Sequence, residues 1–169
     1  MIKIIPATKS IDFDCISKLA HIIWYEHYIS IISLKQIEYM LNKYNSVQAL
    51  EDQVNQGFLF FYITYNESPV GYIGVKKERD YLFLSKLYVL SNYRGKKIGK
   101  AAMQHVIELA HSFKLKKVKL NVNKYNTNSI LAYEKMGFIK TKEMVTDIGN
   151  GFIMDDYEME MTIELRIMN

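Results

Sequence analysis

The sequence is poor in the residues that build cross-links, interdomain linkers and membrane spans. It contains one cysteine, Cys15, so no disulfide can form within the chain and a reducing compartment, the cytoplasm, is expected. It has two prolines and no Pro-rich linker. No apolar run approaches the roughly 18 residues that span a bilayer, and the N-terminus lacks the apolar stretch of a signal peptide. We therefore expect a cytoplasmic protein without a membrane partner, folded as one domain over residues 1–169.

Metal chemistry is not indicated either. The four histidines, His21, His27, His105 and His111, form no ligand spacing with Cys15 or with a pair of carboxylates. Cys15 lies in a helical pattern without a partnered histidine, which favours a packed small side chain over a nucleophile. We expect no metal ion.

What the sequence does contain is a globular composition with an uneven distribution of charge. Hydrophobic residues make up 49% and charged residues 24%, which excludes a disordered chain. Between Ser91 and Lys124, nine Lys or Arg residues stand against Glu108 alone, a local net charge of +8 that leaves −4 elsewhere. A basic segment suits a polyanionic ligand, and an acidic remainder suits a cationic second substrate. Solvated helix and strand faces produce the same pattern, so charge alone leaves both interpretations open.

Hydrophobic periodicity predicts an alternation of helices and strands. The predicted helices are Ser10 to about Tyr28, Leu34–Leu41, a helix from Ser46 ended by Gly57, Ile98–Phe113, and Asn126–Met136 stopped by Gly137. The predicted strands are Ile2–Ile5, Phe58–Tyr65, Val70–Lys76, Leu82–Val89, Lys116–Val122, Phe138–Val145 and roughly Met154–Leu165. Short polar turns make strands two to four an antiparallel meander. A crossover helix makes Lys116–Val122 parallel to the strand before it.

The chain is organised around the turn Tyr93-Arg94-Gly95-Lys96-Lys97-Ile98-Gly99-Lys100. An apolar strand leads into this turn and an amphipathic helix leaves it. That order places backbone N–H groups and the positive end of a helix around a phosphate. The turn matches neither Gly-x-Gly-x-x-Gly nor a Walker loop, and taken alone it is equally consistent with an ordinary strand-to-helix loop.

A second segment at the right distance changes the balance. It runs Asn126-Thr127-Asn128-Ser129-Ile130-Leu131-Ala132-Tyr133-Glu134-Lys135-Met136-Gly137-Phe138. Together with Leu87-Tyr88-Val89 and the turn, it resembles the GCN5-related N-acetyltransferase (GNAT) superfamily. The segments Ile23–Tyr28 and Gly151–Tyr157 resemble its PaiA-type branch, some members of which acetylate polyamines. The resemblance implies an α/β (α+β) fold, with a mixed, mostly antiparallel sheet of about seven strands flanked by helices and a splay between the fourth and fifth strands.

The resemblance also implies acetyl-CoA as co-substrate and gives roles to residues. Leu87, Tyr88 and Val89 would pair with the pantetheine amides. The pyrophosphate would be held by Arg94, Gly95, Lys96, Lys97, Ile98, Gly99 and Lys100, where Gly95 and Gly99 permit close approach. Lys97 replaces the usual middle glycine of the motif, which puts the conformation of the loop in question.

The remaining motif residues concern the pantetheine arm and the chemistry. Asn126 would bond the pantetheine arm, and its other interpretation is a helix N-cap. Tyr133 would act as general acid toward the thiolate that leaves when an amine attacks the thioester. Without the motif, Tyr133 would be read as a half-buried helix aromatic.

The general base is missing from its usual place, because Phe83 occupies the position of the strand Glu that many family members carry. The substitutes are Glu26, His27, Asp155, Asp156, or Tyr88 acting through water, and the sequence does not choose among them. Asp155 and Asp156 read equally well as a turn cap and as an anchor for a cationic substrate. Trp24, Tyr25 and Tyr28 are expected to be core and wall residues.

The leading hypothesis is an N-acetyltransferase that acts on a primary amine, with a polyamine such as spermidine or spermine favoured, by direct attack in a ternary complex. The alternatives are acetylation of a protein or peptide amine and a non-catalytic acyl-CoA-binding regulatory module. A nucleic-acid partner is not expected, because the lysines of the segment Lys114–Lys119 come without a recognition helix or a stacking platform. A homodimer is left open.

Overall fold

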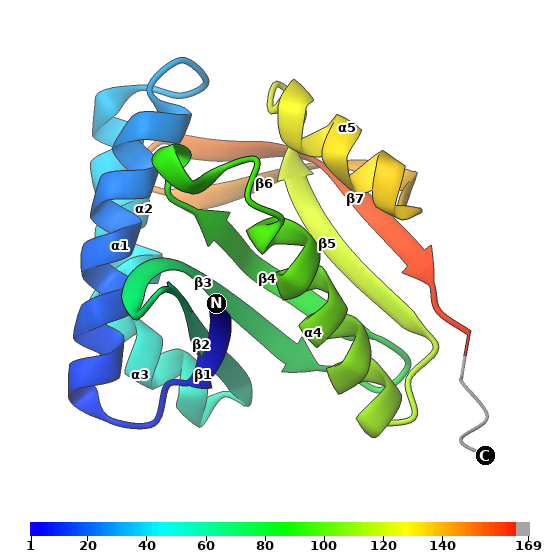
Figure 1. Cartoon of the computed structure of the whole chain (residues 1–169). Coiled ribbons are helices and arrows are strands. Elements are labelled where there is room, and N and C mark those ends of the chain that lie inside the picture. Colours follow the sequence, from blue (N-terminus) through cyan, green and yellow to red (C-terminus); the bar gives the residue numbers. More distant parts are fainter. Residues whose placement is uncertain (165–169) are drawn as a thin grey trace. The chain divides into compact units, whose positions relative to one another are not determined.

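The computed structural model describes residues 1–164, in which seven strands and five α-helices follow one another (Figure 1). The strands are β1 (Ile2–Pro6), β2 (Phe58–Tyr65), β3 (Ser68–Lys77), β4 (Leu82–Val89), β5 (Lys117–Asn123), β6 (Ile139–Gly149) and β7 (Phe152–Thr162). The helices are α1 (Ser10–Tyr28), α2 (Leu34–Asn45), α3 (Val47–Asn55), α4 (Ile98–Ser112) and α5 (Thr127–Met136), with a short 3-10 helix, η1 (Ser91–Tyr93). No helix of the described residues is both long and apolar enough to cross a membrane.

The strands form one sheet in the order β1-β2-β3-β4-β5-β7-β6. The recorded ladders are antiparallel except for β4 and β5, which run parallel. That parallel ladder joins only Leu82–Leu84 to Val118–Leu120. The predicted mixed, mostly antiparallel sheet and the predicted splay between the fourth and fifth strands are therefore confirmed.

Two compact units divide the chain. The first comprises Met1–Lys76 and Ser85–Val106, and the second comprises Lys77–Leu84 and the described residues from Ile107 onward. Strand β4 and helix α4 each begin in one unit and end in the other. A single domain over residues 1–169 stays a prediction.

In the first unit, the hairpin β2–β3 forms where the sequence changes from β-branched and aromatic residues to turn residues. Asn66 and Glu67 connect the strands, both with positive φ (48° and 73°). Two central residues of that kind match the twist of a hairpin. Side chains then alternate across β2, so that Phe60 meets Phe13 of α1 and Phe61 meets His105 of α4. Figure 1 shows α1, α2 and α3 grouped beside β1–β3.

Serine caps position two of these helices. Ser33 Oγ accepts the N–H of Gln36, and Ser46 Oγ accepts the N–H of Ala49. Helix α2 is longer than predicted because it continues to Asn45, directly before the Ser46 cap. At α1, Ser10 is the first helical residue and not the cap, whereas the Asp12 carboxylate accepts the N–H groups of Thr8 and Lys9. The N-cap residue is Lys9, so neither predicted cap residue occupies that position; Asp12, the third helical residue, instead accepts from the two residues that precede the helix.

The second unit contains β5, β7 and β6, the start of β4, and α5. Along β7 the side chains of Met159 and Met161 are buried. Met161 Sδ lies 3.7 Å from the point where a Cβ on Gly137 would stand, directly after α5. Helix α5 therefore covers the methionine face of β7. The hairpin is tighter than the predicted loop 147–151, because β6 runs to Gly149 and leaves only Asn150 and Gly151 between the strands. Residue Leu165 of the predicted last strand lies outside the described residues.

Candidate functional site

The turn between β4 and α4 presents backbone N–H groups without a protein acceptor. Tyr93 N–H donates to the carbonyl of Leu90 (3.0 Å) and Arg94 N–H to that of Ser91 (3.2 Å). Within residues 1–164, the N–H groups of Gly95, Lys96 and Lys97 donate to no protein acceptor, and the first α4 bond runs from Ala101 N to the Lys97 carbonyl (3.1 Å). The first N–H groups of any α-helix also lack an acceptor within the helix, because no earlier helical turn supplies a carbonyl. Such a series of N–H groups is suited to an anion.

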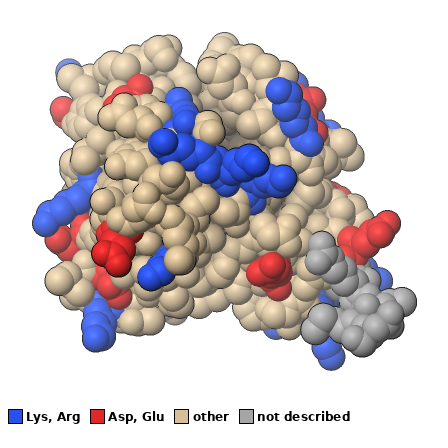
Figure 2. All heavy atoms as spheres, viewed as in Figure 1, with Lys and Arg blue, Asp and Glu red and all other residues tan. Residues whose placement is uncertain are grey.

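Exposed cations surround these N–H groups. The side chains of Arg94, Lys96, Lys97 and Lys100 are exposed, and Figure 2 shows Lys and Arg side chains gathered where Figure 1 places η1 and the start of α4. Arg94 Nη2 lies 3.4 Å from His27 Nδ1, and Lys96 Nζ lies 5.5 Å from the centre of the Tyr65 ring. The turn therefore combines positive charge with oriented dipoles, as the sequence predicts.

Lys97 has a left-handed backbone conformation, with φ of 65°. Gly95 is also left-handed, with φ of 79°. A residue with a Cβ pays roughly 1–2 kcal/mol for this conformation, whereas glycine adopts it readily. The loop therefore keeps the backbone shape that a glycine at position 97 would favour, although the sequence supplies a lysine. A Cβ added to Gly95 or Gly99 would meet no atom within 4 Å, so there is open space beside both residues.

The end of β4 is held by aromatic contacts within the first unit. The Tyr88 hydroxyl lies 3.0 Å from that of Tyr28, and its ring lies 5.3 Å from the ring of Tyr72. Trp24 Nε1 donates to the Tyr72 hydroxyl at 3.1 Å, and burial raises the pKa of Tyr72 well above its usual range. Trp24 and Tyr28 are thus core and wall residues, as predicted, whereas Tyr25 is 36% exposed.

The position of Leu87, Tyr88 and Val89 follows from the same strand. The recorded β4–β5 ladder ends at Leu84, so these three residues lie beyond it. Their role toward pantetheine amides stays a prediction.

In the second unit, Asn126 immediately precedes α5. Its backbone carbonyl accepts the N–H of Ile130 at 3.0 Å, but its side chain makes no capping hydrogen bond. The N-cap interpretation of its side chain is therefore wrong, although Asn126 occupies the cap position. The side chain is only 5% exposed. A buried amide that does not cap its helix is suited to a ligand's polar groups, because buried polar groups are normally hydrogen-bonded.

Tyr133 is the seventh residue of α5 and is half-buried. Its ring contacts that of Phe138 edge-on, with centroids 5.5 Å apart. Its carbonyl accepts the N–H of Phe138 at 3.0 Å, and Gly137 ends the helix in a left-handed conformation. The helix end thus fixes the backbone of Tyr133.

The candidates for a general base differ in their surroundings. Glu26 is exposed and accepts a long hydrogen bond from the N–H of Ser91 (3.4 Å), and His27 lies beside Arg94. Asp155 forms an ion pair with Lys124 at 3.0 Å. Asp156 is 5% exposed, and burial together with the nearby Asp155 charge raises its pKa to about 6. Both aspartates lie inside β7, so their interpretation as a turn cap is wrong.

Sequence reasoning missed Lys86, the buried lysine of β4. Its Nζ donates to Gln53 Oε1 at 2.9 Å and lies 5.3 Å from the centre of the Phe60 ring. Burial lowers the pKa of Lys86 to about 8. The alternation of side chains along a strand could have indicated this burial, because Lys86 shares a face of β4 with the buried Leu82 and Leu84.

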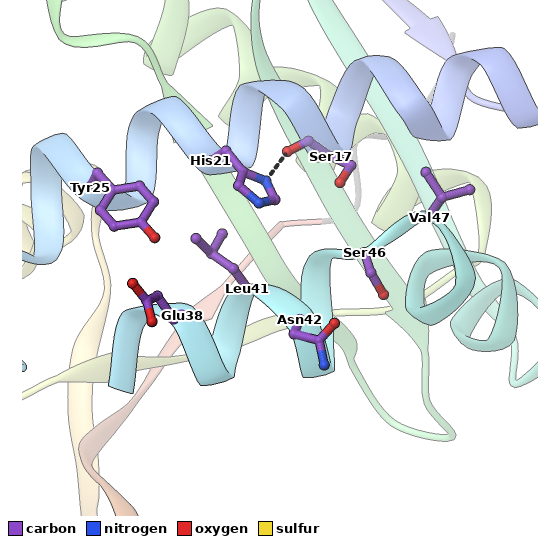
Figure 3. Close-up of a pocket in the computed structure, with 8 residues that line it drawn as sticks. All are labelled: Ser17, His21, Tyr25, Glu38, Leu41, Asn42, Ser46 and Val47. Atoms are coloured by element: carbon purple, nitrogen blue, oxygen red, sulfur yellow. Dashed lines mark hydrogen bonds between the residues drawn. The ribbon is translucent and has the colours of Figure 1, made fainter. Parts of the chain in front are cut away.

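A pocket of about 200 Å³ lies apart from the motif residues, between α1 and α2. Figure 3 shows His21 and Tyr25 of α1 facing Glu38 and Asn42 of α2 across it. It is lined by Ser17, His21, Tyr25, Glu38, Leu41, Asn42, Ser46 and Val47. Because this lining contains neither Lys nor Arg, the pocket does not suit the pyrophosphate of a nucleotide. In residues 1–164 no cluster of His, Cys, Asp or Glu is placed to hold a metal ion.

Comparison with known proteins places these observations in a family. Residues 22–138 match the family described as Acetyltransferase (GNAT) family. The peptidyl-lysine N-acetyltransferase YjaB of Salmonella typhimurium is 27% identical over 118 residues, which are 68% of this chain and 75% of YjaB. Among solved structures, the PaiA N-acetyltransferase of Thermoplasma acidophilum in complex with coenzyme A has a TM-score of 0.80 at 24% identity, covering 96% of this chain and 99% of that chain. A GCN5-related N-acetyltransferase of Rhodopseudomonas palustris has a TM-score of 0.80 at 17% identity, covering 95% of each chain.

The fold and the basic turn thus define an acetyl-CoA-dependent N-acetyltransferase, an enzyme that acetylates an amine. Since the family match extends over more than half of the chain, the protein belongs to the acetyltransferase (GNAT) family. The predicted family, enzyme class and acetyl-CoA are confirmed, whereas the individual site residues stay predictions.

Proposed function

We propose that the enzyme transfers the acetyl group of acetyl-CoA to the primary amine of a small cationic acceptor, with a polyamine favoured, by direct attack in a ternary complex. The observation that carries direct attack is the state of Cys15, the one cysteine of the sequence. Burial, reinforced by Asp12 and Asp14, raises the pKa of its thiol. A thiol of raised pKa is a poor acyl-accepting nucleophile. The amine itself is therefore the nucleophile.

The donor is bound by residues of the two motif segments. The N–H groups of Gly95, Lys96 and Lys97, with the start of α4 at Ile98, Gly99 and Lys100, bind the pyrophosphate, and Arg94 adds charge. The backbone of Leu87, Tyr88 and Val89 pairs with the pantetheine amides. The Asn126 side chain, buried and not used as a cap, bonds the same arm. Tyr133 protonates the departing thiolate.

A cationic acceptor is supported by the distribution of charge. Outside the segment Ser91–Lys124 the chain carries a net charge of −4, which attracts an ammonium group. A lysine side chain of a protein carries the same ammonium, and YjaB is named as a peptidyl-lysine N-acetyltransferase. Peptidyl lysine is therefore the second candidate acceptor.

The release of CoA thiol with a panel of amines tests the acceptor. We expect turnover with spermidine and spermine to exceed that with a monoamine of matched length, because their three and four amino groups are attracted more strongly than one by the net negative charge outside Ser91–Lys124. Lysine-containing peptides form the second arm of the panel. Turnover confined to the peptides would favour the second candidate, and tight acetyl-CoA binding without turnover of any amine would contradict the proposal.

The conformation of Lys97 gives a separate prediction. We expect Lys97→Gly to be more stable than Lys97→Ala by about 1 kcal/mol, since only glycine relieves the left-handed conformation. Both variants lose the same charge, so we expect both to bind acetyl-CoA about fivefold more weakly, the effect of one exposed ion pair. Thermal melts and calorimetric titration separate the two effects. Equal stability of the two variants would contradict the conformational argument, and unchanged affinity would contradict the role of Lys97 in donor binding.

A further inference from the structure

Strand β7 carries four carboxylates, and Lys residues neutralise three of them. Asp155 pairs with Lys124 (3.0 Å). Glu158 lies 3.5 Å from Lys142 and 3.8 Å from Lys119, and Glu160 lies 3.0 Å from Lys117. The fourth carboxylate, Asp156, has neither a hydrogen bond nor an ion pair within residues 1–164, although it is the most buried of the four. A buried carboxylate without a partner is costly, and such groups are expected to have a ligand.

The register of the sheet places Asp156 at the carboxyl end of β5. Asp156 lies opposite Asn123 of β5 and Met144 of β6, both uncharged. Directly after Asn123 the chain turns into α5, and this turn is bonded to β7 because Lys124 N–H donates to the Asp155 carbonyl at 3.0 Å. Asp156 and the buried Asn126 therefore belong to the same end of the same sheet segment.

The two faces of β7 at this end have different roles. Tyr157, Met159 and Met161 share the face that α5 covers. Because side chains alternate along a strand, Asp156 lies on the opposite face. The proposed acid, Tyr133, comes from α5, so Asp156 is placed to serve a substrate that approaches from the other face of the sheet.

We infer that Asp156 binds the ammonium group of the acceptor and takes the proton that this group must lose before it attacks. The inference rests on the proposed function. Burial and the Asp155 charge raise the pKa of Asp156 to about 6, which makes its carboxylate a stronger base than an ordinary aspartate. A base of this kind contributes about 10²–10⁴-fold to an acyl transfer.

The proton and electron balance of the step is complete. The ammonium gives one proton to the Asp156 carboxylate, and the freed lone pair forms the C–N bond with the thioester carbonyl carbon. The C–S bond breaks with its electron pair on sulfur, and the thiolate takes the phenol proton of Tyr133. The nitrogen's second proton then restores the phenol through water, and Asp156 releases its proton to solvent. The products are the amide, CoA thiol and one proton.

Two neighbouring charges shift the pKa of Asp156, and each can be changed without replacing Asp156 itself. Asp155 raises the pKa of Asp156, and Lys124 lowers it. Glu143 of β6 lies 3.6 Å from Lys124, on the side of the Asp155 ion pair. On the face of Asp156 itself the next charge along β7 is Glu158, which Lys119 and Lys142 neutralise.

The test is the pH profile of kcat/KM with spermidine. The primary ammonium groups of spermidine stay protonated between about pH 5 and 8, so the substrate does not titrate in this range. We expect the wild-type profile to fall below about pH 6, the pKa of Asp156. Asp155→Asn is expected to move this fall to lower pH, and Lys124→Met to higher pH. Asp156→Asn is expected to remove it and to lower kcat/KM by about 10²-fold or more. Glu160→Gln, at the far end of β7, is the matched control and should leave the profile unchanged.

Folding and donor binding are checked on the same variants. Because the pKa of Asp156 is higher in the folded protein than in the unfolded chain, protonation of Asp156 favours folding. This contribution to stability is full below the pKa of the unfolded chain and is lost as the pH rises through about 6. Asp156→Asn should therefore melt at or above the wild-type temperature at pH 7.5, with acetyl-CoA affinity unchanged. The inference would be overturned if Asp156→Asn kept the wild-type turnover and pH profile. It would also be overturned if the pH profile moved in neither Asp155→Asn nor Lys124→Met.

The failure of the proposed function looks different. In that case the wild type itself gives no turnover with any amine. Calorimetric titration with spermidine then tests the ammonium site at Asp156 without turnover. Binding to the wild type that is lost in Asp156→Asn supports the site. Equal binding to the wild type and the variant, or no binding to either, overturns it.

Discussion

Replacing Tyr133 by phenylalanine is expected to lower kcat by about 10²–10³-fold while the affinity for acetyl-CoA changes by less than about twofold, since only the phenol proton is removed. The Tyr133 ring packs edge-on against Phe138, and phenylalanine retains that contact. The backbone of the helix end, held by Gly137, is also unaffected. The loss should therefore appear in the rate of acetyl transfer and not in donor binding.

Thiol release at saturating acetyl-CoA, with a calorimetric titration of the donor, measures both quantities. Tyr125→Phe is the matched control, because Tyr125 precedes the same helix but is 69% exposed. It loses a hydroxyl of the same kind and should retain full turnover. If Tyr133→Phe kept the wild-type kcat, another group would supply the proton. If instead it lost acetyl-CoA binding, the hydroxyl would serve the donor and not the chemistry.

The sequence predicted the parts of the fold that local chemistry decides. Strand β2 was predicted with its observed bounds, because the aromatic and β-branched run Phe58–Tyr65 is enclosed by Gly57 and Asn66. Ser46 was predicted as the start of a helix, and its hydroxyl caps α3. The segment around Gly95 was predicted as a basic turn before a helix. In each case the signal lies within a few residues of the feature.

The features that long-range burial decides were not predictable in this way. Nothing local distinguishes Lys86 from an exposed lysine, and its pKa is lowered by burial, which the folded sheet alone produces. Asp155 and Asp156 are adjacent in sequence, yet strand alternation sends one to Lys124 and the other to a buried face. Asn126 occupies the cap position of α5 that the sequence indicates, but only the structure shows that its side chain makes no capping hydrogen bond.

Gly71→Ala is expected to cause the largest loss of stability, about 3 kcal/mol, which corresponds to a fall in Tm of roughly 6–12 °C. A Cβ at Gly71 would stand 2.4 Å from the carbonyl oxygen of Tyr88 and 3.3 Å from Val89 Cα. Both obstacles are backbone atoms, so rotation of a side chain cannot relieve the clash and β3 must move away from the end of β4. Because Tyr88 and Val89 are proposed to bind pantetheine, we also expect KM for acetyl-CoA to rise.

Alanine variants of two further glycines, Gly74 and Gly99, serve as comparisons, and thermal melts measure the stability of all three variants. At Gly74 the nearest atom to a new Cβ is Phe60 Cε1 at 2.7 Å, and a ring can shift partly where a backbone carbonyl cannot, so Gly74→Ala should lose less than Gly71→Ala. At Gly99, in the first turn of α4, a Cβ meets nothing within 4 Å. Gly99→Ala should therefore be neutral or gain up to about 1 kcal/mol, since alanine favours a helix over glycine. The expected loss of stability therefore decreases in the order Gly71, Gly74, Gly99, according to the atoms that each new Cβ would meet. If Gly71→Ala were as stable as Gly99→Ala, the backbones of β3 and of the end of β4 would not be in close contact.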